Sequence, residues 1–242
     1  FVWIPVGEYK VSTSINATGK LKNNLTRRKW PGRNVNNKPT EIKGDSVIDT
    51  YFYGEGDSRS IAKDTINKFK ASATEKGGFY IGRYEQGINN VCKKNIEPYV
   101  NILKSEANSQ GKKMYSGNNY VTSELISSYA WDTALNFICQ TNTARYKLAT
   151  TTDNTYGNMH TQIATKTGEY KVNGKESDKY SNIYDIIGNR SEWTTEYCSM
   201  SNYPWNQRGA EFYNDSNYAA VRQHNNSSKS SNIGFRVQLY IK

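Results

Sequence analysis

The sequence predicts one α+β domain spanning all 242 residues. Two amphipathic helix patterns lie in the middle of the chain, strand-like segments open and close it, and the rest is rich in polar loops. Helices grouped apart from strands in this way are typical of α+β architecture rather than of a parallel α/β sheet.

The N-terminal segment predicts a strand followed by a long polar excursion. Residues 1–11 (FVWIPVGEYKV) are rich in β-branched and aromatic side chains, which favour a strand. Residues 12–58 show no sustained period, and we expect a surface excursion containing a short strand over 47–53.

Two helices are predicted from apolar spacing. The first covers residues 60–76, with Ser60 as its N-cap and Gly77-Gly78 ending it; its apolar positions are Ala62, Ile66, Phe69 and Ala73. The second begins at a cap on Thr122 or Ser123, and its apolar positions are Ile126, Ala130, Ala134 and Ile138.

The remaining segments read as strands and loops. We expect a strand over 79–84, a loop over 107–119, short strand-like pieces after Thr141, and a closing strand over 235–241.

Composition limits the function classes. The net charge of +10 would favour an acidic partner, but Lys and Arg are spread along the chain and only residues 27–29 form a tight basic cluster. We therefore expect a solvated basic surface rather than nucleic-acid binding. A hydrophobic content of 36% leaves few aliphatic side chains for the core. The 19 Tyr and 5 Trp offset this shortage, because each buried ring removes a large area from water.

Cysteine usage and hydropathy exclude two further classes. Cys92, Cys139 and Cys198 are far apart and show no zinc-ligand spacing, so we expect buried small side chains. No apolar run approaches the ~20 residues that a bilayer requires, so no membrane insertion is expected. The chain begins at Phe1, which leaves a signal peptide or an upstream domain open.

A polar run near the C-terminus is the most informative feature. Residues 212–232 contain five Asn and five Ser among twenty-one residues, and packing residues frame them at 183–193 and 233–237. Such a run is too polar for a core. It indicates a surface displayed on a rigid base, and hence binding rather than catalysis.

Catalytic and metal patterns are sparse. The two histidines, His160 and His224, have no carboxylate at metal-ligand spacing, so a facial iron site or a histidine base is poorly supported. Asp185 and Glu192, with Gly188 and Arg190 between them, offer oxygens for calcium. The same spacing also fits an ion pair of Glu192 with an arginine, or a turn cap.

Six blocks of sequence follow one another along nearly the whole chain: Val2-Trp-Ile-Pro5, Gly78 to Glu85, Ser128 to Ala134, Ile183 to Trp193, Arg208-Gly209 and Ile233 to Arg236. In these blocks and their order the sequence resembles formylglycine-generating-enzyme-like domains, the sulfatase-modifying-factor relatives, which have a C-type lectin-like fold. The resemblance implies a C-type lectin-like fold with two helices, short twisted antiparallel sheets and many loops.

Within this family, the catalytic branches are disfavoured. Copper-dependent members use a pair of cysteines after the Arg-Gly-Gly block, whereas no cysteine follows Cys198 here. The iron-dependent sulfoxide synthases need a His-rich helical domain that this chain does not resemble. No catalytic residue and no required cofactor are therefore expected.

The variable proteins of diversity-generating retroelements fit better. In those proteins the segment before the terminal Gly-Phe-Arg is rewritten by adenine-directed mutagenesis, and the Asn-rich run resembles that segment. We call residues 208–237 the display segment. Its expected ligand contacts are Glu211, Tyr213, Asn214, Asp215, Val221, Gln223, His224 and Asn225. Its expected scaffold residues are Phe212, Trp193, Arg208, Arg222, Phe235 and Arg236.

The resemblance also bears on metal binding. Asp185, the Gly188 and Arg190 carbonyls and Glu192 match positions that hold structural calcium in the enzyme branch. Two departures weaken the match: Ala210 replaces the usual second Gly, and Arg190-Ser191 replaces the usual hydrophobic-Trp pair.

The sequence thus predicts a receptor-recognition protein, on a phage tail or a bacterial cell surface, that binds a protein or a cell-surface glycan, with oligomerisation left open. The alternatives are a nonhaem metal oxidase of the formylglycine-generating type and a fixed carbohydrate-binding virion subunit.

Overall fold

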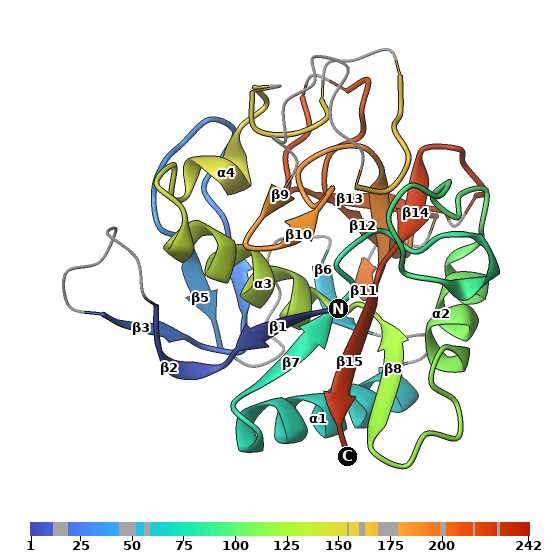
Figure 1. Cartoon of the computed structure of the whole chain (residues 1–242). Coiled ribbons are helices and arrows are strands. Elements are labelled where there is room, and N and C mark those ends of the chain that lie inside the picture. Colours follow the sequence, from blue (N-terminus) through green and yellow to red (C-terminus); the bar gives the residue numbers. More distant parts are fainter. Residues whose placement is uncertain are drawn as a thin grey trace.

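Two larger β-sheets, three two-stranded pairs, four α-helices and a short 3-10 helix (Ile88–Asn90) form the mixed α/β architecture of the computed structural model within its described residues (Figure 1). The structure describes residues 1–11, 19–43, 52–55, 59–153, 155–159, 163–168, 179–198, 202–214, 216–226 and 228–242. None of the helices within these ranges is long and apolar enough to cross a bilayer.

The first sheet has the strand order β1-β7-β15-β8 and is antiparallel throughout. Its strands are β1 (Val2–Pro5), β7 (Gly78–Ile81), β15 (Val237–Ile241) and β8 (Val121–Leu125). The two chain ends therefore meet in one sheet. Residues 1–11 form two strands rather than one, because Gly7 (φ +89°) begins β2 (Gly7–Lys10), which pairs with β3 (Lys20–Asn23).

The second sheet carries the C-terminal half of the chain. It has the order β13-β12-β11-β14, and β6 also pairs with β11. Its strands are β13 (Arg222–Asn225), β12 (Trp205–Arg208), β11 (Ser191–Cys198), β14 (Ile233–Phe235) and β6 (Phe52–Glu55). β14 runs parallel to β11, so the expectation of antiparallel sheets alone was wrong.

Besides β2-β3, two further two-stranded pairs lie outside these sheets. β4 (Arg27–Lys29) pairs with β5 (Thr40–Ile42), and β9 (Lys179–Tyr180) pairs with β10 (Ile183–Tyr184).

The helices differ from prediction in number and in bounds. α1 (Arg59–Glu75) is the expected first helix, and Gly77 in the left-handed region (φ +71°) follows its end. α3 (Ser128–Thr141) starts after the predicted cap: its N-cap is Ser127, whose Oγ accepts from the Ala130 N–H at 3.2 Å. Residues 121–125 form β8 instead.

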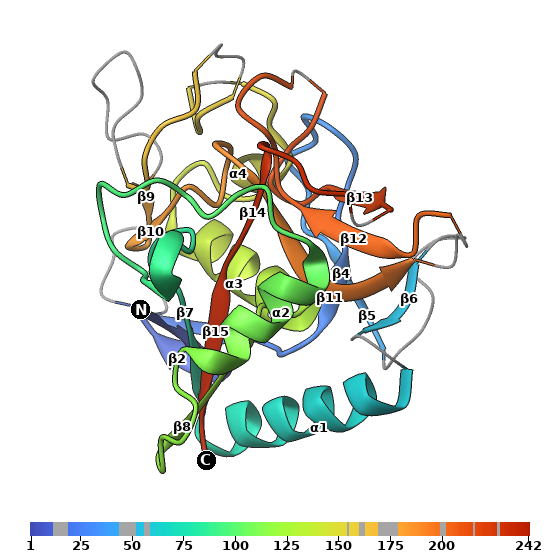
Figure 2. The same ribbon diagram turned by 90° about the vertical axis from the view of Figure 1, so that its right-hand side faces the viewer.

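Two helices were not predicted. α2 (Lys104–Lys113) occupies part of the expected loop 107–119, and α4 (Lys147–Thr150) is a single turn. Figures 1 and 2 show α1 along the lower end of the first sheet and α2 beside β8. The short strand expected over 47–53 lies mostly outside the described residues, as does the side chain of Ser60.

The core divides into two apolar clusters. The larger one gathers around α3 and includes Phe69, Phe79 and Trp131, all essentially inaccessible to solvent. The smaller one lies under α2 and includes Trp193 and Phe235. Trp193 donates its indole N–H to the Ile102 carbonyl at 3.0 Å, which satisfies its polar group inside the core.

Two of the three residues in the basic cluster at 27–29 are buried, and only Lys29 is exposed. Arg27 and Arg28 on β4 are buried (0% and 1% exposed). Arg27 Nη1 lies 3.7 Å from Glu196 Oε1, and the Arg28 backbone N–H donates to Asp132 Oδ2 at 2.8 Å. The Arg27 guanidinium therefore faces an interior carboxylate, whereas the Arg28 guanidinium lies 3.5 Å from Glu41 Oε1, on a side chain that is 43% exposed.

Candidate ligand-binding surface

The display segment rests on two separate strand pairings. β13 pairs antiparallel with β12, placing Arg222 opposite Arg208 and Gln223 opposite Gln207. β14 pairs in parallel with β11, which places Phe235 opposite Trp193. The residues between these strands are therefore held at one end by β12 and at the other by β11.

Side chains alternate along β13, as strand geometry requires. Arg222 points inward: Nη2 donates to Asp132 Oδ2 at 2.6 Å and Nε to Glu196 Oε2 at 3.0 Å. Gln223 and Asn225 lie on the opposite face, where both hydrogen bond the Gln207 side chain. One face of this strand is thus fixed by ion pairs and the other carries amides.

His224 shares the face of Arg222 but lies further along the strand, where it is exposed. Its ring makes an edge contact with Tyr203, with centroids 5.7 Å apart. The predicted contacts on β13 therefore divide between two faces, with Gln223 and Asn225 on one and His224 on the other.

A buried network of charged side chains links β12 and β13 to α3 and β11. Arg208 Nη2 donates to Asp132 Oδ1 at 2.6 Å, and the side chains of Asp132, Glu196 and Arg208 are all 0% exposed. Burial alone would raise the pKa of Asp132, but Arg208 and Arg222 hold that pKa well below its ordinary value. Removing one partner of such a network leaves an uncompensated charge in the interior.

The loop after β12 presents Tyr213. Gly209 adopts φ +87°, and Ala210 is fully buried. Tyr213 is 51% exposed, packs edge-on against Phe212 at 5.1 Å between centroids, and accepts a hydrogen bond from Asn232 Nδ2 at 2.9 Å. This last bond joins the two ends of the display segment.

Glu211 lies beneath this surface rather than on it. It is only 7% exposed, and its Oε1 accepts from Ser191 Oγ at 3.3 Å. Burial and a hydrogen bond with Glu211 raise the pKa of Tyr213. Glu211 is therefore a support for Tyr213, and the sequence-based assignment of this side chain as a ligand contact does not fit its burial.

The other predicted positions can be placed in turn. Tyr213 and His224 are exposed, while Asn214, Val221, Gln223 and Asn225 are half-buried. Asp215 lies outside the described residues, and so does His160. Of the predicted scaffold, Trp193, Arg208, Phe235 and Arg236 are fully buried; Phe212 is half-buried beneath Arg190, whose guanidinium lies 5.1 Å from its ring centroid.

Sequence reasoning missed three residues that organise the surface: Gln207, Asp132 and Asn232. Asp132 carried little signal, because helical spacing places it on the side opposite the predicted apolar positions, where a solvated carboxylate is expected. Gln207 and Asn232 carried none, because their roles depend on the register of β12 with β13 and on the fold of the 209–214 loop.

The predicted calcium positions surround an arginine. Arg236 donates to both oxygens of Glu192 at 2.7 to 3.2 Å and to the Tyr184 carbonyl at 2.9 Å, and it is fully buried. Asp185 Oδ2 accepts a hydrogen bond from the Gly168 N–H at 2.7 Å. Gly188 and Asn158 form an isolated parallel β-bridge. Arg190 reaches the Ser231 carbonyl at 2.7 Å.

This arrangement does not fit a calcium ion on Glu192, because a guanidinium group already occupies both of its oxygens. The described residues hold no group of three His, Cys, Asp or Glu side chains arranged for a metal. Glu85 lies close by, and burial together with Asp185 and Glu192 raises its pKa well above the ordinary value. The carboxylates here are balanced by Arg236, with Arg190 contributing.

No family model matches the chain. No curated protein matches it either. Among solved structures, the chain is similar to the crystal structure of CarF, with a TM-score of 0.52 and 11% identity over 100% of this chain and 98% of that one. It is also similar to variable protein 1 of Treponema denticola, with a TM-score of 0.41 and 12% identity over 98% and 92% of the two chains. The first likeness indicates a shared overall fold at low identity.

Proposed function

We propose that the chain is a receptor-recognition protein on a C-type lectin-like scaffold, which binds a protein or a cell-surface glycan through the display segment. The observation that carries the proposal is the division of side chains along this segment. Arg208, Arg222 and Arg236 are fixed in buried ion pairs, whereas Tyr213, Gln223, His224 and Asn225 reach solvent at the surface.

This division suits a surface that changes in sequence while its fold stays constant. Stability resides in the buried charges and in Trp193 and Phe235, so exposed positions can vary at little cost to folding. Tyr supplies large contact area with few rotatable bonds, and Asn, Gln and Ser supply adaptable hydrogen bonds, as in antibody paratopes. We further propose that a diversity-generating retroelement rewrites this segment in a phage or bacterium.

The proposal assigns no catalytic step and places the protein on a phage tail or a bacterial cell surface. Its rival, a metal oxidase on the same scaffold, predicts a redox metal in stoichiometric amount, which elemental analysis of the purified protein would reveal.

Binding is tested with a printed glycan array and a panel of intact bacterial cells as probes. The variant combining Tyr213→Ala, Gln223→Ala and His224→Ala should lose capture of whichever probe the parent protein binds, with a melting temperature within a few degrees. Tyr120→Ala removes another exposed tyrosine, 78% accessible and remote in sequence, and should keep capture. Capture retained by the triple variant, or lost together with folding, contradicts the assignment.

Diversification is tested at the encoding locus. A near-copy of the region encoding 208–237 that differs mainly at adenines, beside a reverse transcriptase gene, supports a diversified receptor. A locus with neither leaves a fixed binding subunit and removes only the second half of the proposal.

A further inference from the structure

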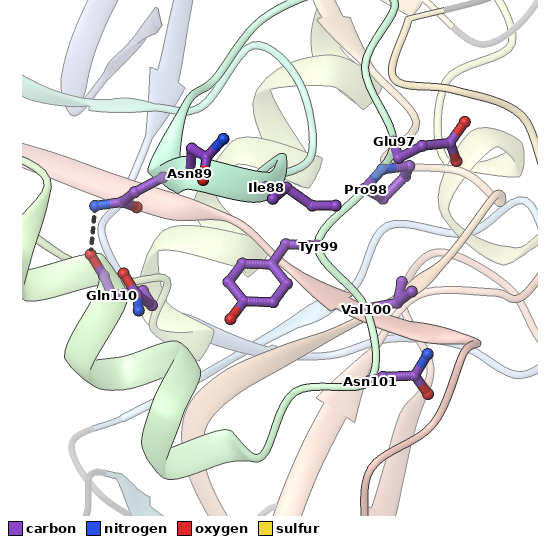
Figure 3. A pocket seen from close by; sticks show the side chains of 9 residues that line it. Ile88, Asn89, Glu97, Pro98, Tyr99, Val100, Asn101 and Gln110 are labelled. Atoms are coloured by element: carbon purple, nitrogen blue, oxygen red, sulfur yellow. Dashed lines mark hydrogen bonds between the residues drawn. The ribbon is translucent and has the colours of Figure 1, made fainter.

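A cleft of about 640 Å³ opens between the 86–101 loop and α2 (Figure 3). This volume lies within the roughly 300–1,000 Å³ usual for small-molecule sites. Its lining residues are Ile88, Asn89, Asn90, Glu97, Pro98, Tyr99, Val100, Asn101 and Gln110. None of them was assigned to the display surface.

This lining is rich in amides and carries one acidic side chain. Four of the nine side chains are Asn or Gln, each of which both donates and accepts hydrogen bonds. No lysine, arginine or histidine is among these nine described residues. The one carboxylate, Glu97, points away from the ring of Tyr99 in Figure 3. Such a lining favours an uncharged ligand with many hydroxyl groups over a phosphate or a carboxylate.

Tyr99 supplies an aromatic wall. Figure 3 shows its ring in the middle of the cleft, between Ile88 and α2. The ring is backed by Phe235, with centroids 6.1 Å apart, and the Tyr99 backbone N–H donates to the Gln86 carbonyl at 2.7 Å. A ring held in this way offers an apolar face to the C–H face of a sugar, and amides around it can bond the hydroxyls.

The Asn90 side chain is held in place before any ligand arrives. Asn89, Asn90 and Asn101 adopt left-handed φ values of 63°, 58° and 55°, which Asn tolerates better than most residues. Asn90 Oδ1 accepts from Gln86 Nε2 at 3.2 Å, and its Nδ2 donates to the Gln110 carbonyl at 3.0 Å. Side chains fixed in this way lose little entropy on binding.

Gln86 does not line the cleft but contacts a lining residue, since its Nε2 donates to Asn90 Oδ1. It is 1% exposed, and its Oε1 has no hydrogen-bond partner within the described part of the chain. A buried acceptor without a partner is costly, so this amide is suited to a water or a ligand hydroxyl reaching in beside Asn90.

We propose that this cleft binds a neutral saccharide unit. The site is separate from the exposed side chains of the display segment, although the Asn101 N–H donates to the Ser230 carbonyl at 2.9 Å and so links the two regions. This inference does not depend on diversification or on the ligand of the display segment.

Saturation-transfer NMR on the full chain tests the proposal. The neutral probes are the methyl glycosides of glucose, galactose, mannose and N-acetylglucosamine; the anionic comparators are sialic acid and glucose 6-phosphate. We expect saturation transfer to at least one neutral sugar, with a Kd in the ~mM range because one small sugar makes few contacts. The anionic comparators should bind more weakly.

Variants locate the binding. Asn89→Gly with Asn101→Gly removes two lining amides at positive-φ positions that Gly adopts without strain, and should weaken the sugar at least ~10-fold. Asn95→Gly is the matched control, because Asn95 has φ 62° in the same loop but does not line the cleft. Its affinity should equal that of the parent chain.

The proposal is overturned by no transfer to any neutral sugar, by preference for the anionic comparators, by unchanged affinity in the double variant, or by equal loss in Asn95→Gly. The triple variant at Tyr213, Gln223 and His224 should retain sugar binding. Loss of sugar binding in the triple variant would assign the sugar to the display segment and rule out a separate site in the cleft. The proposed receptor function would not be affected.

Discussion

Arg222 reaches from β13 to α3, where its Nη2 donates to Asp132 Oδ2 at 2.6 Å, while its neighbour Gln223 faces the other way onto Gln207. Two consecutive residues therefore serve different purposes. One locks the strand to the core and the other belongs to the exposed face.

This contrast predicts opposite effects of adjacent substitutions. Arg222→Met should destabilise the protein by about 3–5 kcal/mol, because Asp132 and Glu196 lose a buried partner. Gln223→Ala should change stability by less than about 1 kcal/mol, since it removes one half-buried amide contact. Urea denaturation of the two variants beside the parent chain measures both, and equal effects would contradict the division of faces.

Glu124 on β8 gives the protein a pH-dependent stability. Burial raises the pKa of this carboxyl to about 7, against hydrogen bonds from Tyr240 and Gln238 that lower it. A raised carboxyl pKa means that the folded state holds the proton more tightly. The stabilisation that this carboxyl gives the folded state is fully present below the unfolded pKa of ~4.3 and is lost as pH rises through about 7.

As pH rises from 5 to 8, the free energy of unfolding of Glu124→Gln should therefore increase relative to that of the parent protein by up to ~3 kcal/mol, at about 1.36 kcal/mol per pKa unit. Denaturation curves at both pH values give the difference. Glu75→Gln, at a carboxylate whose side chain is 70% exposed, should show no such change and serves as the control. A gain that is the same at both pH values would show that Glu124 does not titrate in this range.

Arg236, rather than a divalent cation, is expected to neutralise Glu192. Excess EDTA should leave the melting temperature unchanged, whereas Glu192→Gln should lower stability by about 3–5 kcal/mol because Arg236 loses its buried partner. A melting temperature that falls with EDTA and returns with added calcium would restore the calcium site inferred from family resemblance.

Gly111 in α2 is predicted to resist replacement. Alanine normally favours a helix by roughly 0.5–1 kcal/mol over glycine. Here a Cβ would lie 2.5 Å from the Leu125 backbone nitrogen of β8, so Gly111→Ala should instead destabilise the protein. Ser109→Ala, on the exposed side of the same helix, should be neutral or stabilising. Thermal denaturation of both variants distinguishes packing from propensity.

Local signals in the sequence identified α1 and most of α3 because their apolar residues recur at helical spacing. The start of α3 was misplaced because residues 121–125 pair with β15, more than a hundred positions away, and no local pattern reports that partner. α2 was missed because its buried positions are Lys104, Ala107, Asn108 and Gly111. A lysine is not expected at a buried position, but Lys104 Nζ lies 4.2 Å from the Trp205 ring centroid in a cation–π contact.

The buried frame of the proposed binding surface was predictable in outline and not in detail. The contrast between the polar run and its apolar frame predicted Trp193, Phe235 and Arg236 as scaffold residues, and all three are fully buried. The burial of Glu211 and the two-sided arrangement of β13 depend on strand register, which a single sequence does not encode locally. The parallel pairing of β14 with β11 is a long-range choice of the same kind.

The separate anchoring of β13 and β14 has a consequence for engineering. Asn225 ends a strand held by β12, and Ile233 begins one held by β11, so the distance between these two points is set without the residues that connect them. Doubling the length of such a connection costs only about 0.6 kcal/mol in loop closure. Foreign peptides of different lengths can therefore be grafted between Asn225 and Ile233, which makes the chain a scaffold whose insert is chosen by length as well as by sequence.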